Sequence, residues 1–244
     1  MCAHDGPQTG HAADAIPGLG RARGSFVLRV PDEFPVPLAV PLSEPLWAPD
    51  DIMARMAVQV LSAVGRYDAF VEVVGVKKPG GQGCWCMAYR DSRVPNDERP
   101  QFMRDECAHE PGPGVLAYVD DDVAGWCSVA PRSSYRRLMR SRTIPFVDER
   151  DAWSVVCFVV RPPFRGRGLM HDLLDGAVAH AVASGAEVVE GYPVDVGTGD
   201  RVDLISGYVG TRGLFEAAGF TRAAATTGHS GGRPRVLMRR ELAP

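Results

Sequence analysis

The stretch FVVRPPFRGRGLMHDLL, residues 158–174, decides how the rest of the chain is interpreted. An apolar run leads into a Pro-Pro pair, then into two glycines set between arginines, and then into an amphipathic helical pattern. Proline and glycine interrupt regular structure, whereas apolar runs and helical periodicity indicate elements on either side of the interruption. The stretch therefore predicts a buried strand that passes through a tight loop directly into a helix N-terminus.

The loop has the features of a phosphate-binding site. The first N–H groups of a helix have no partner within the helix, and the helix dipole attracts anions to that end. Glycine lets a phosphate approach these groups closely, and Arg165 and Arg167 can add charge-assisted hydrogen bonds. The sequence has neither the three-glycine dinucleotide fingerprint nor the Gly-Lys-Ser/Thr of a P-loop. The loop therefore predicts a cradle for the phosphate or pyrophosphate of a different kind of ligand.

The patterns around the loop predict a mixed sheet. Residues 114–131 alternate like two strands around an acidic turn, and 153–160 form a continuous apolar run, typical of a strand covered on both faces. A helix is expected at about 166–184, a further strand at 187–194, a helix at 211–220 and a final pair of strands. Strands and helices in this order are typical of an α/β fold.

Two motifs resemble those of the GNAT N-acetyltransferase superfamily. Residues 214–220, LFEAAGF, are similar to its L-Y-E-x-x-G-F pattern. The segment GCWCMAYR, which contains Cys84 and Cys86, resembles a bacterial subgroup of the superfamily. The resemblance runs from about Gly114 to the C-terminus. The acyl-CoA loop motif of the superfamily, V-x-P-x-x-R-G-x-G, is formed here by Val160, Pro162, Arg165, Gly166 and Gly168.

The resemblance implies a GNAT-like mixed sheet with a splayed central strand pair and helices on both faces. The separation of that pair, 153–160 and 187–194, would admit the pantetheine arm of acetyl-CoA or another acyl-CoA. We expect a disordered leader at 1–24, a region at 25–113 that contributes to the acceptor site, and the acyl-CoA-binding core at 114–244. The expected donor site consists of Phe158, Val159, Val160, Arg165, Gly166, Arg167, Gly168, Leu169, Met170 and His171.

Acyl transfer from a thioester to an amine needs a proton acceptor, a donor to the thioester oxygen and a proton for the leaving thiolate. A backbone N–H group around Val160 is expected to bind the thioester oxygen. Glu190 is the candidate base, because partial burial beside the strand split would raise its pKa; pairing with an arginine is the alternative. Tyr208 is the candidate acid and Tyr192 its competitor, with a structural hydrogen bond as the alternative for either.

Two residues depart from the family pattern. Met170 stands where the loop motif normally has glycine or alanine, so it is expected to narrow or reshape the phosphate site. Phe215 replaces the tyrosine that often serves as general acid, so that role must move or be unnecessary. These departures keep two hypotheses open beside the main one. In the first, the acyl group comes from the phosphopantetheine of a carrier protein in secondary metabolism; in the second, the chain binds acyl-CoA without catalysis.

Two other groups of residues have a simple interpretation beside a functional one. Five arginines within 132–142 predict a solvated face or a docking patch for an acidic partner, such as a carrier protein or the 3′-phosphate of CoA. Cys84, Cys86, Cys107 and His109 are zinc-binding residue types, but their C-x-C spacing is tighter than that of a zinc finger. The cysteine stretch is therefore expected to pack in a wall of the acceptor pocket or simply in the core, and no metal is predicted. A zinc-stabilised interaction protein is the alternative from another class.

The composition argues against several classes of function. The chain has 27 Lys and Arg against 30 Asp and Glu, a net charge of -3, which gives no support for nucleic-acid or membrane-surface binding. No apolar run approaches the roughly 20 residues of a transmembrane helix, and the N-terminus lacks a signal-peptide pattern. The composition therefore predicts a cytoplasmic protein. The resemblance implies an acyltransferase that moves an acetyl or other acyl group from CoA to a primary amine of a small molecule or protein. A helix through Leu61 is also expected, within the N-terminal region.

Overall fold

A computed structural model of the chain describes residues 57–78, 81, 83–87, 89–197 and 207–242, so the predicted leader lies outside the described residues. The strands are β1 (Val58–Ser62), β2 (Gly114–Val119), β3 (Asp122–Pro131), β4 (Trp153–Val160), β5 (Val188–Gly191), β6 (Thr221–Ser230) and β7 (Arg233–Glu241). The helices are α1 (Tyr67–Val74), α2 (Arg99–Ala108), α3 (Arg136–Met139), α4 (Leu169–Ala183) and α6 (Arg212–Ala217). No helix in this part of the chain is both long and apolar enough to cross a membrane.

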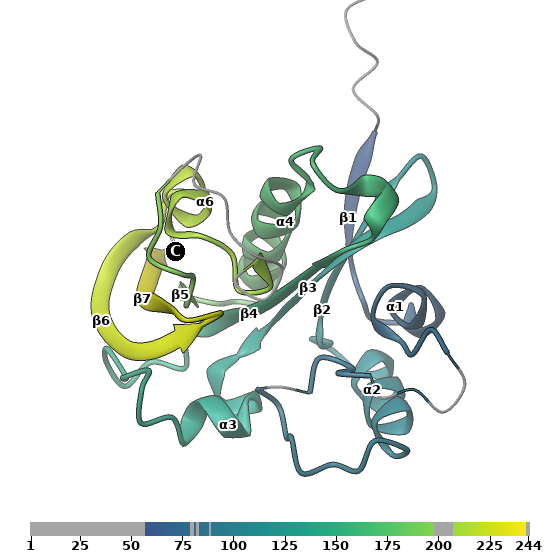
Figure 1. Ribbon diagram of the computed structural model, residues 1–244, viewed down its shortest axis with the longest axis horizontal. Coiled ribbons are helices and arrows are strands. Elements are labelled where there is room, and N and C mark those ends of the chain that lie inside the picture. Colours follow the sequence, from purple (N-terminus) through teal and green to yellow (C-terminus); the bar gives the residue numbers. More distant parts are fainter. Residues whose placement is uncertain (1–56, 79–80, 82, 88, 198–206, 243–244) are drawn as a thin grey trace, which may run out of the picture. The chain divides into compact units, whose positions relative to one another are not determined.

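The predicted mixed α/β sheet is confirmed. The seven described strands form one sheet in the order β1-β2-β3-β4-β5-β7-β6. Only β4 and β5 pair in parallel, because α4 connects them as a crossover helix. Along β2, Val115, Ala117 and Val119 pack in the core that contains α4, whereas Leu116 packs with α1 and α2. The sheet therefore carries α4 on one face and α1 and α2 on the other (Figure 1), as expected.

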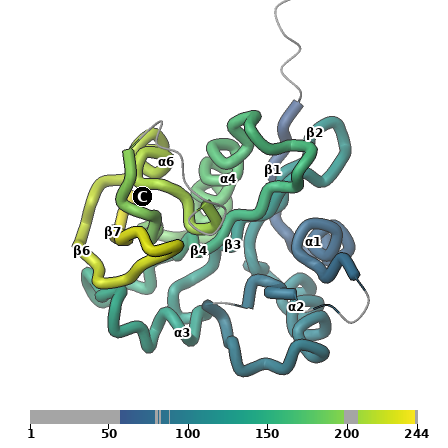
Figure 2. The backbone as a smooth tube through the Cα atoms, viewed as in Figure 1, coloured from purple at the N-terminus to yellow at the C-terminus, as the bar shows by residue number. Residues whose placement is uncertain are grey.

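The parallel pair β4 and β5 separates after a short contact. Residues 153–155 of β4 lie opposite 189–191 of β5. β5 then ends at Gly191, whereas β4 continues to Val160 beside β3. The backbone path in Figure 2 shows β3 and β4 running together past α4. The splayed pair is thus formed by the two strands that the loop motif indicated.

The N-terminal edge of the sheet differs from the expectation. Residues 58–62 form β1, paired antiparallel with β2, where a helix was predicted. The alternation of Val58 and Val60 fits a strand, and both side chains pack against the core that contains α4. A Cβ on Gly176 of α4 would lie 2.3 Å from the Val60 side chain, so glycine permits this close approach. β1 also lies upstream of Gly114, where the acyl-CoA-binding core was expected to begin.

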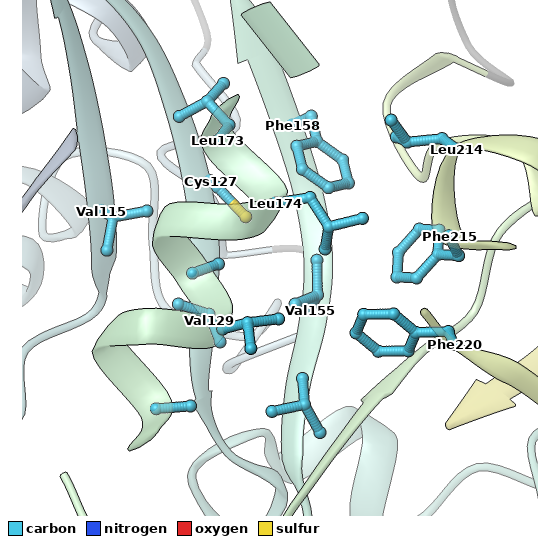
Figure 3. Close-up of a cluster of buried hydrophobic side chains, with 14 of the residues drawn as sticks. Val115, Cys127, Val129, Val155, Phe158, Leu173, Leu174, Leu214, Phe215 and Phe220 are labelled. Carbon is cyan, nitrogen blue, oxygen red and sulfur yellow. The ribbon is translucent and has the colours of Figure 1, made fainter. Parts of the chain in front are cut away.

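Three aromatic side chains pack together in the core beside α4 (Figure 3). The Phe215 ring lies edge-on to Phe158 and Phe220, at centroid distances of 6.3 Å and 5.0 Å. Gly191, the last residue of β5, makes room for it, because a Cβ there would lie 2.0 Å from the Phe215 ring. Phe215 is fully buried, so the position at which the family pattern has a tyrosine belongs to the core in this chain.

Candidate active site

The loop between β4 and α4 is built around two glycines in the left-handed region. Gly166 has a φ of 75° and Gly168 a φ of 79°, a conformation that strains any residue with a Cβ. Gly168 is also the N-cap residue of α4. A Cβ on either glycine would meet no atom within 4 Å. A ligand group can therefore approach the loop backbone and the N-terminus of α4 closely.

A cavity of about 400 Å³, here called the donor pocket, opens at this loop. Its other wall comes from residues 207–214, where the chain enters α6. Eight of the ten residues predicted for the donor site line it: Phe158, Val160, Arg165, Gly166, Gly168, Leu169, Met170 and His171. Sequence reasoning did not assign the remaining lining residues to the donor site: Phe164, Gly207, Tyr208, Gly210, Thr211 and Leu214. For those within 207–211, the sequence signal was the glycine-containing segment GYVGT just before α6.

The other two predicted residues, Val159 and Arg167, do not line the donor pocket. The Val159 side chain packs against the cluster that contains α1, because successive residues of a strand face opposite sides of the sheet. The Arg167 guanidinium lies 6.0 Å from the ring centre of Phe164. The structure thus places these two side chains outside the donor pocket, and their part in donor binding stays a prediction.

The separated end of β4 presents backbone N–H groups to the donor pocket. The N–H group of Arg161 donates to the carbonyl of Ala124, in β3, at 2.9 Å. Alternation along a strand therefore turns the N–H groups of Phe158 and Val160 away from β3, towards the split. The first of these donates to the backbone carbonyl of Tyr208 at 2.7 Å. The N–H group of Val160 points in the same direction, as the predicted interaction with the thioester oxygen requires.

A second cavity, of about 890 Å³, lies beside the donor pocket and is here called the second pocket. Its walls come from the end of α1, from the last part of β4 and from Cys84, Cys86 and Tyr89. Val160, Arg165 and Tyr208 line both cavities. The two pockets therefore meet at the end of β4, where two reactants could approach each other.

The two tyrosines that were candidates for the general acid lie in different surroundings. Tyr208 is 38% exposed and lies at the junction of the two pockets. Tyr192 is fully buried; its hydroxyl lies 2.8 Å from that of Ser154 and donates to Glu190 at 3.0 Å. Burial, and then the charge of Glu190, raise the pKa of Tyr192. Tyr192 therefore makes the buried structural hydrogen bond that was the alternative for either tyrosine, whereas Tyr208 stays a candidate acid.

Glu190, the predicted base, lines neither pocket. Its side chain is almost completely buried, and Oε2 accepts hydrogen bonds from Arg132 and from Tyr192, each at 3.0 Å. Oε1 lies 3.4 Å from Nε of Arg239. Because β4 and β5 are still paired at this position, the carboxylate is enclosed and has no opening towards an amine. These contacts match the alternative interpretation of Glu190 as a partner for arginine and do not favour its prediction as the base.

The cysteine-rich stretch forms part of the wall of the second pocket, through Cys84 and Cys86. The N–H group of Cys86 donates to Sγ of Cys84 at 3.2 Å, and Trp126 Nε1 donates to Sγ of Cys86 at 2.7 Å. Cys107 is buried on α2, and the ring of His109 contacts a backbone carbonyl of the same helix. Among the described residues, no three His, Cys, Asp or Glu side chains are placed to hold a metal ion.

The arginine-rich segment after β3 lies away from the loop. Pro131, just before it, pairs with Trp153 at the start of β4, whereas the loop follows the end of that strand. Arg132 is buried in the ion pair with Glu190, and Arg136 pairs with Asp91 at 3.0 Å. In Figure 1 α3 lies below the sheet and α4 above it. These arginines therefore add no direct contact to the donor pocket.

The split strand, the glycine loop and the two joined pockets form one candidate site at the end of β4. Residues 84–195 match the model of the Acetyltransferase (GNAT) family. This range contains β4, the loop, α4 and β5, which together build most of the donor pocket. This segment therefore matches the superfamily that the motifs predicted, and the match supports acyl transfer from CoA.

Solved structures include several similar chains, whereas the comparison with curated proteins found no match. One acetyltransferase is 17% identical, with a TM-score of 0.46, and the match covers 76% of this chain and 100% of that chain. An acetyltransferase of the GNAT family from Bacillus cereus is 12% identical, with a TM-score of 0.44, and the match covers 77% of this chain and 99% of that chain. An acetyltransferase of the GNAT family from Streptococcus pneumoniae is 14% identical, with a TM-score of 0.44, and the match covers 76% of this chain and 100% of that chain.

Proposed function

We propose that this protein transfers an acyl group, most simply acetyl, from CoA to a primary amine. The observation that carries the proposal is the junction of the two pockets at the end of β4. An acyl-CoA in the donor pocket would place its thioester near Val160, and an amine in the second pocket would approach the same point. Holding two reactants in such an arrangement accounts for a large share of the rate enhancement in group transfer.

The donor pocket suits the two chemically different parts of CoA. The pyrophosphate would lie against the loop at Gly166 and Gly168, where no side chain fills the space next to the backbone. The Arg165 guanidinium is fixed beside it, because its Nε donates to the carbonyl of Val160 at 2.9 Å. Met170 packs partly against the core, so it forms apolar wall beside the cradle and leaves the glycines accessible. The pantetheine arm would follow the separated end of β4.

The reaction forms an N–C amide bond and breaks the C–S bond of the thioester. The N–H group of Val160 is the donor to the oxygen that becomes negative, and Tyr208 gives the proton that the leaving thiolate takes up. The amine loses one proton. Glu72, the carboxylate that lines the second pocket, is held by Arg161 at 2.7 Å, so we assign this proton to water at the pocket opening. The rate should then rise with pH as the neutral fraction of the acceptor amine rises.

Calorimetric titration with acetyl-CoA tests the donor site. We expect saturable binding by the intact protein and binding about tenfold weaker or worse in Arg165→Ala, because charge-assisted hydrogen bonds to phosphate are lost. Arg140→Ala removes the same charge from the exposed end of α3 and should bind as the intact protein does. No saturable binding by the intact protein, or equal loss in both variants, would contradict the proposal.

Two further measurements separate the alternatives. Release of free CoA in the presence of a mixture of amines, followed by mass spectrometry, distinguishes an enzyme from a module that only binds acyl-CoA. Titration with pantetheine beside CoA tests the carrier-protein hypothesis, because a carrier presents the arm through a single phosphate and without the adenosine nucleotide of CoA. We expect CoA to bind more tightly than pantetheine, since the glycine loop faces the phosphates.

A further inference from the structure

Charge is unevenly distributed around the second pocket. Its lining contains three cationic side chains, Lys77, Arg161 and Arg165, and one described carboxylate, that of Glu72. The Glu72 carboxylate is paired with Arg161 at 2.7 Å, and Nζ of Lys77 donates to the backbone carbonyl of Glu72. One cation is therefore neutralised, and the ammonium of Lys77 is held at the rim with no carboxylate among the described lining residues left for it. Among the described lining residues, positive charge is therefore in excess.

The remaining wall of the second pocket is mainly apolar. The two thiols of its cysteine stretch stay neutral near pH 7. Burial raises the pKa of Cys86, and a hydrogen bond with Cys86, together with burial, raises the pKa of Cys84. They therefore add no negative charge. The apolar side chains come from α1, from β4 and from the turn before α6: Val73, Val74, Val156, Val159 and Val209.

This distribution discriminates between amines. An amine that carries several positive charges would meet the cations of the rim and would bury no apolar surface. An amine with an apolar body gains from contact with the valines. A carboxylate on the same molecule gains from the cationic rim, because opposite charges in a partly enclosed pocket are screened less than on an open surface. The pocket is thus complementary to a molecule that carries an amine, an apolar body and one anionic group.

We propose that the acyl acceptor is a hydrophobic amino acid or a closely similar amine with a carboxylate, and that Lys77 binds the carboxylate. This inference rests on the proposed function. The α-amino group would point to the junction at Val160 and Tyr208, and the side chain would lie against the apolar wall. Lys77 then determines specificity through the binding of the acceptor, and it takes no part in the proton transfers.

A panel of matched acceptors tests the proposal with the intact protein and acetyl-CoA. Phenylalanine and leucine are compared with phenethylamine and 3-methylbutylamine, which lack only the carboxylate, and with spermidine, which has several charges. The N-acetylated products are measured by mass spectrometry. We expect kcat/KM for the two amino acids to exceed that of the decarboxylated amines and spermidine by tenfold or more.

Two neighbouring lysines provide the variant and its control. Lys77→Met should raise KM for phenylalanine about tenfold with little change in kcat, and should leave phenethylamine unaffected. Lys78→Met removes the same charge from an exposed neighbour that does not line the pocket, and should change neither substrate. A KM effect confined to the carboxylate-bearing substrate is not expected from a merely structural role of Lys77.

The outcomes separate this inference from the proposed function. If acetyl-CoA does not bind and no amine is acylated, the proposed function fails, and the inference fails with it. If phenethylamine or spermidine is acetylated as well as phenylalanine, or if Lys77→Met affects all acceptors equally, the inference alone is overturned. If acetyl-CoA binds without turnover, phenylalanine is titrated into the CoA complex. Absent binding, or binding unchanged by Lys77→Met, then overturns the inference.

Discussion

The two ends of β4 differ in what surrounds them. At the Trp153 end the strand pairs with β5, and the charged groups nearby are enclosed, with Glu190 between Arg132 and Arg239. At the Val160 end the partner strand has ended, and glycines and apolar residues surround the meeting point of two pockets. The comparison teaches that this site is made by backbone groups that lose their strand partner. Glu190, the buried carboxylate of this region, has a structural role at the closed end.

The largest expected effect is on stability, at the closed end. Glu190→Gln leaves the buried guanidinium of Arg132 without its ionic partner, and removing one member of a buried pair costs about 3–5 kcal/mol. Urea denaturation should show this loss, whereas the affinity of the folded protein for acetyl-CoA should not change. Glu241→Gln, at the exposed end of β7, should move the midpoint little. An unchanged midpoint for Glu190→Gln would break the comparison.

The next effect is on donor binding, at the open end. Gly168→Val forces a β-branched residue to a φ of 79° and fills the space beside the loop. The valine side chain would occupy the space that the phosphate needs, so acetyl-CoA binding should weaken roughly 10- to 100-fold by calorimetry. Gly185→Val is the matched control, because that glycine has a φ of 80° and open surroundings at the other end of α4. The same loss of affinity in both variants would show that the loop is not the donor site.

A smaller effect is expected on catalysis. Tyr208→Phe removes the proposed proton donor, but a thiol has a pKa of only about 8.5, so its thiolate leaves readily without help. We expect kcat to fall about tenfold in steady-state assays, with little change in KM for acetyl-CoA. Tyr192→Phe should instead lower stability, since that hydroxyl lies in a buried hydrogen-bond network. A loss of kcat in Tyr192→Phe alone would reverse the two assignments.

The smallest effect concerns the pH dependence of stability. His180 of α4 lies against Trp153 and 2.9 Å from the carbonyl of Pro111, and burial lowers its pKa. The folded protein therefore binds this proton less readily than the unfolded chain, so the free energy of unfolding should fall as the pH drops below about 6.5. His180→Gln should flatten this decline in urea titrations between pH 7 and 5. An equally steep decline in the variant would contradict the assignment.

Local sequence patterns predicted the loop and the helix after it. They failed where contacts between residues far apart in the sequence determine the structure. The loop and α4 could be predicted because proline, glycine and helical periodicity act over a few residues. The edge strand β1 was mistaken for a helix, because its pairing of Val58 with Val119 joins distant parts of the chain. The ion pair of Glu190 joins it to Arg132, 58 residues away, and no spacing rule reports such a contact. The second pocket is lined by at least four separate segments, and no motif joins them in the sequence.

Hydrogen exchange followed by mass spectrometry, with and without acetyl-CoA, tests the central claim most directly. The account predicts slower exchange on binding in peptides from 158–171 and 207–214, because their backbone N–H groups line the donor pocket. Peptides from 188–192, at the closed end of the split, should exchange at the same rate in both states. Slower exchange at 188–192 with no change in the loop would contradict the placement of the donor at the open end of β4.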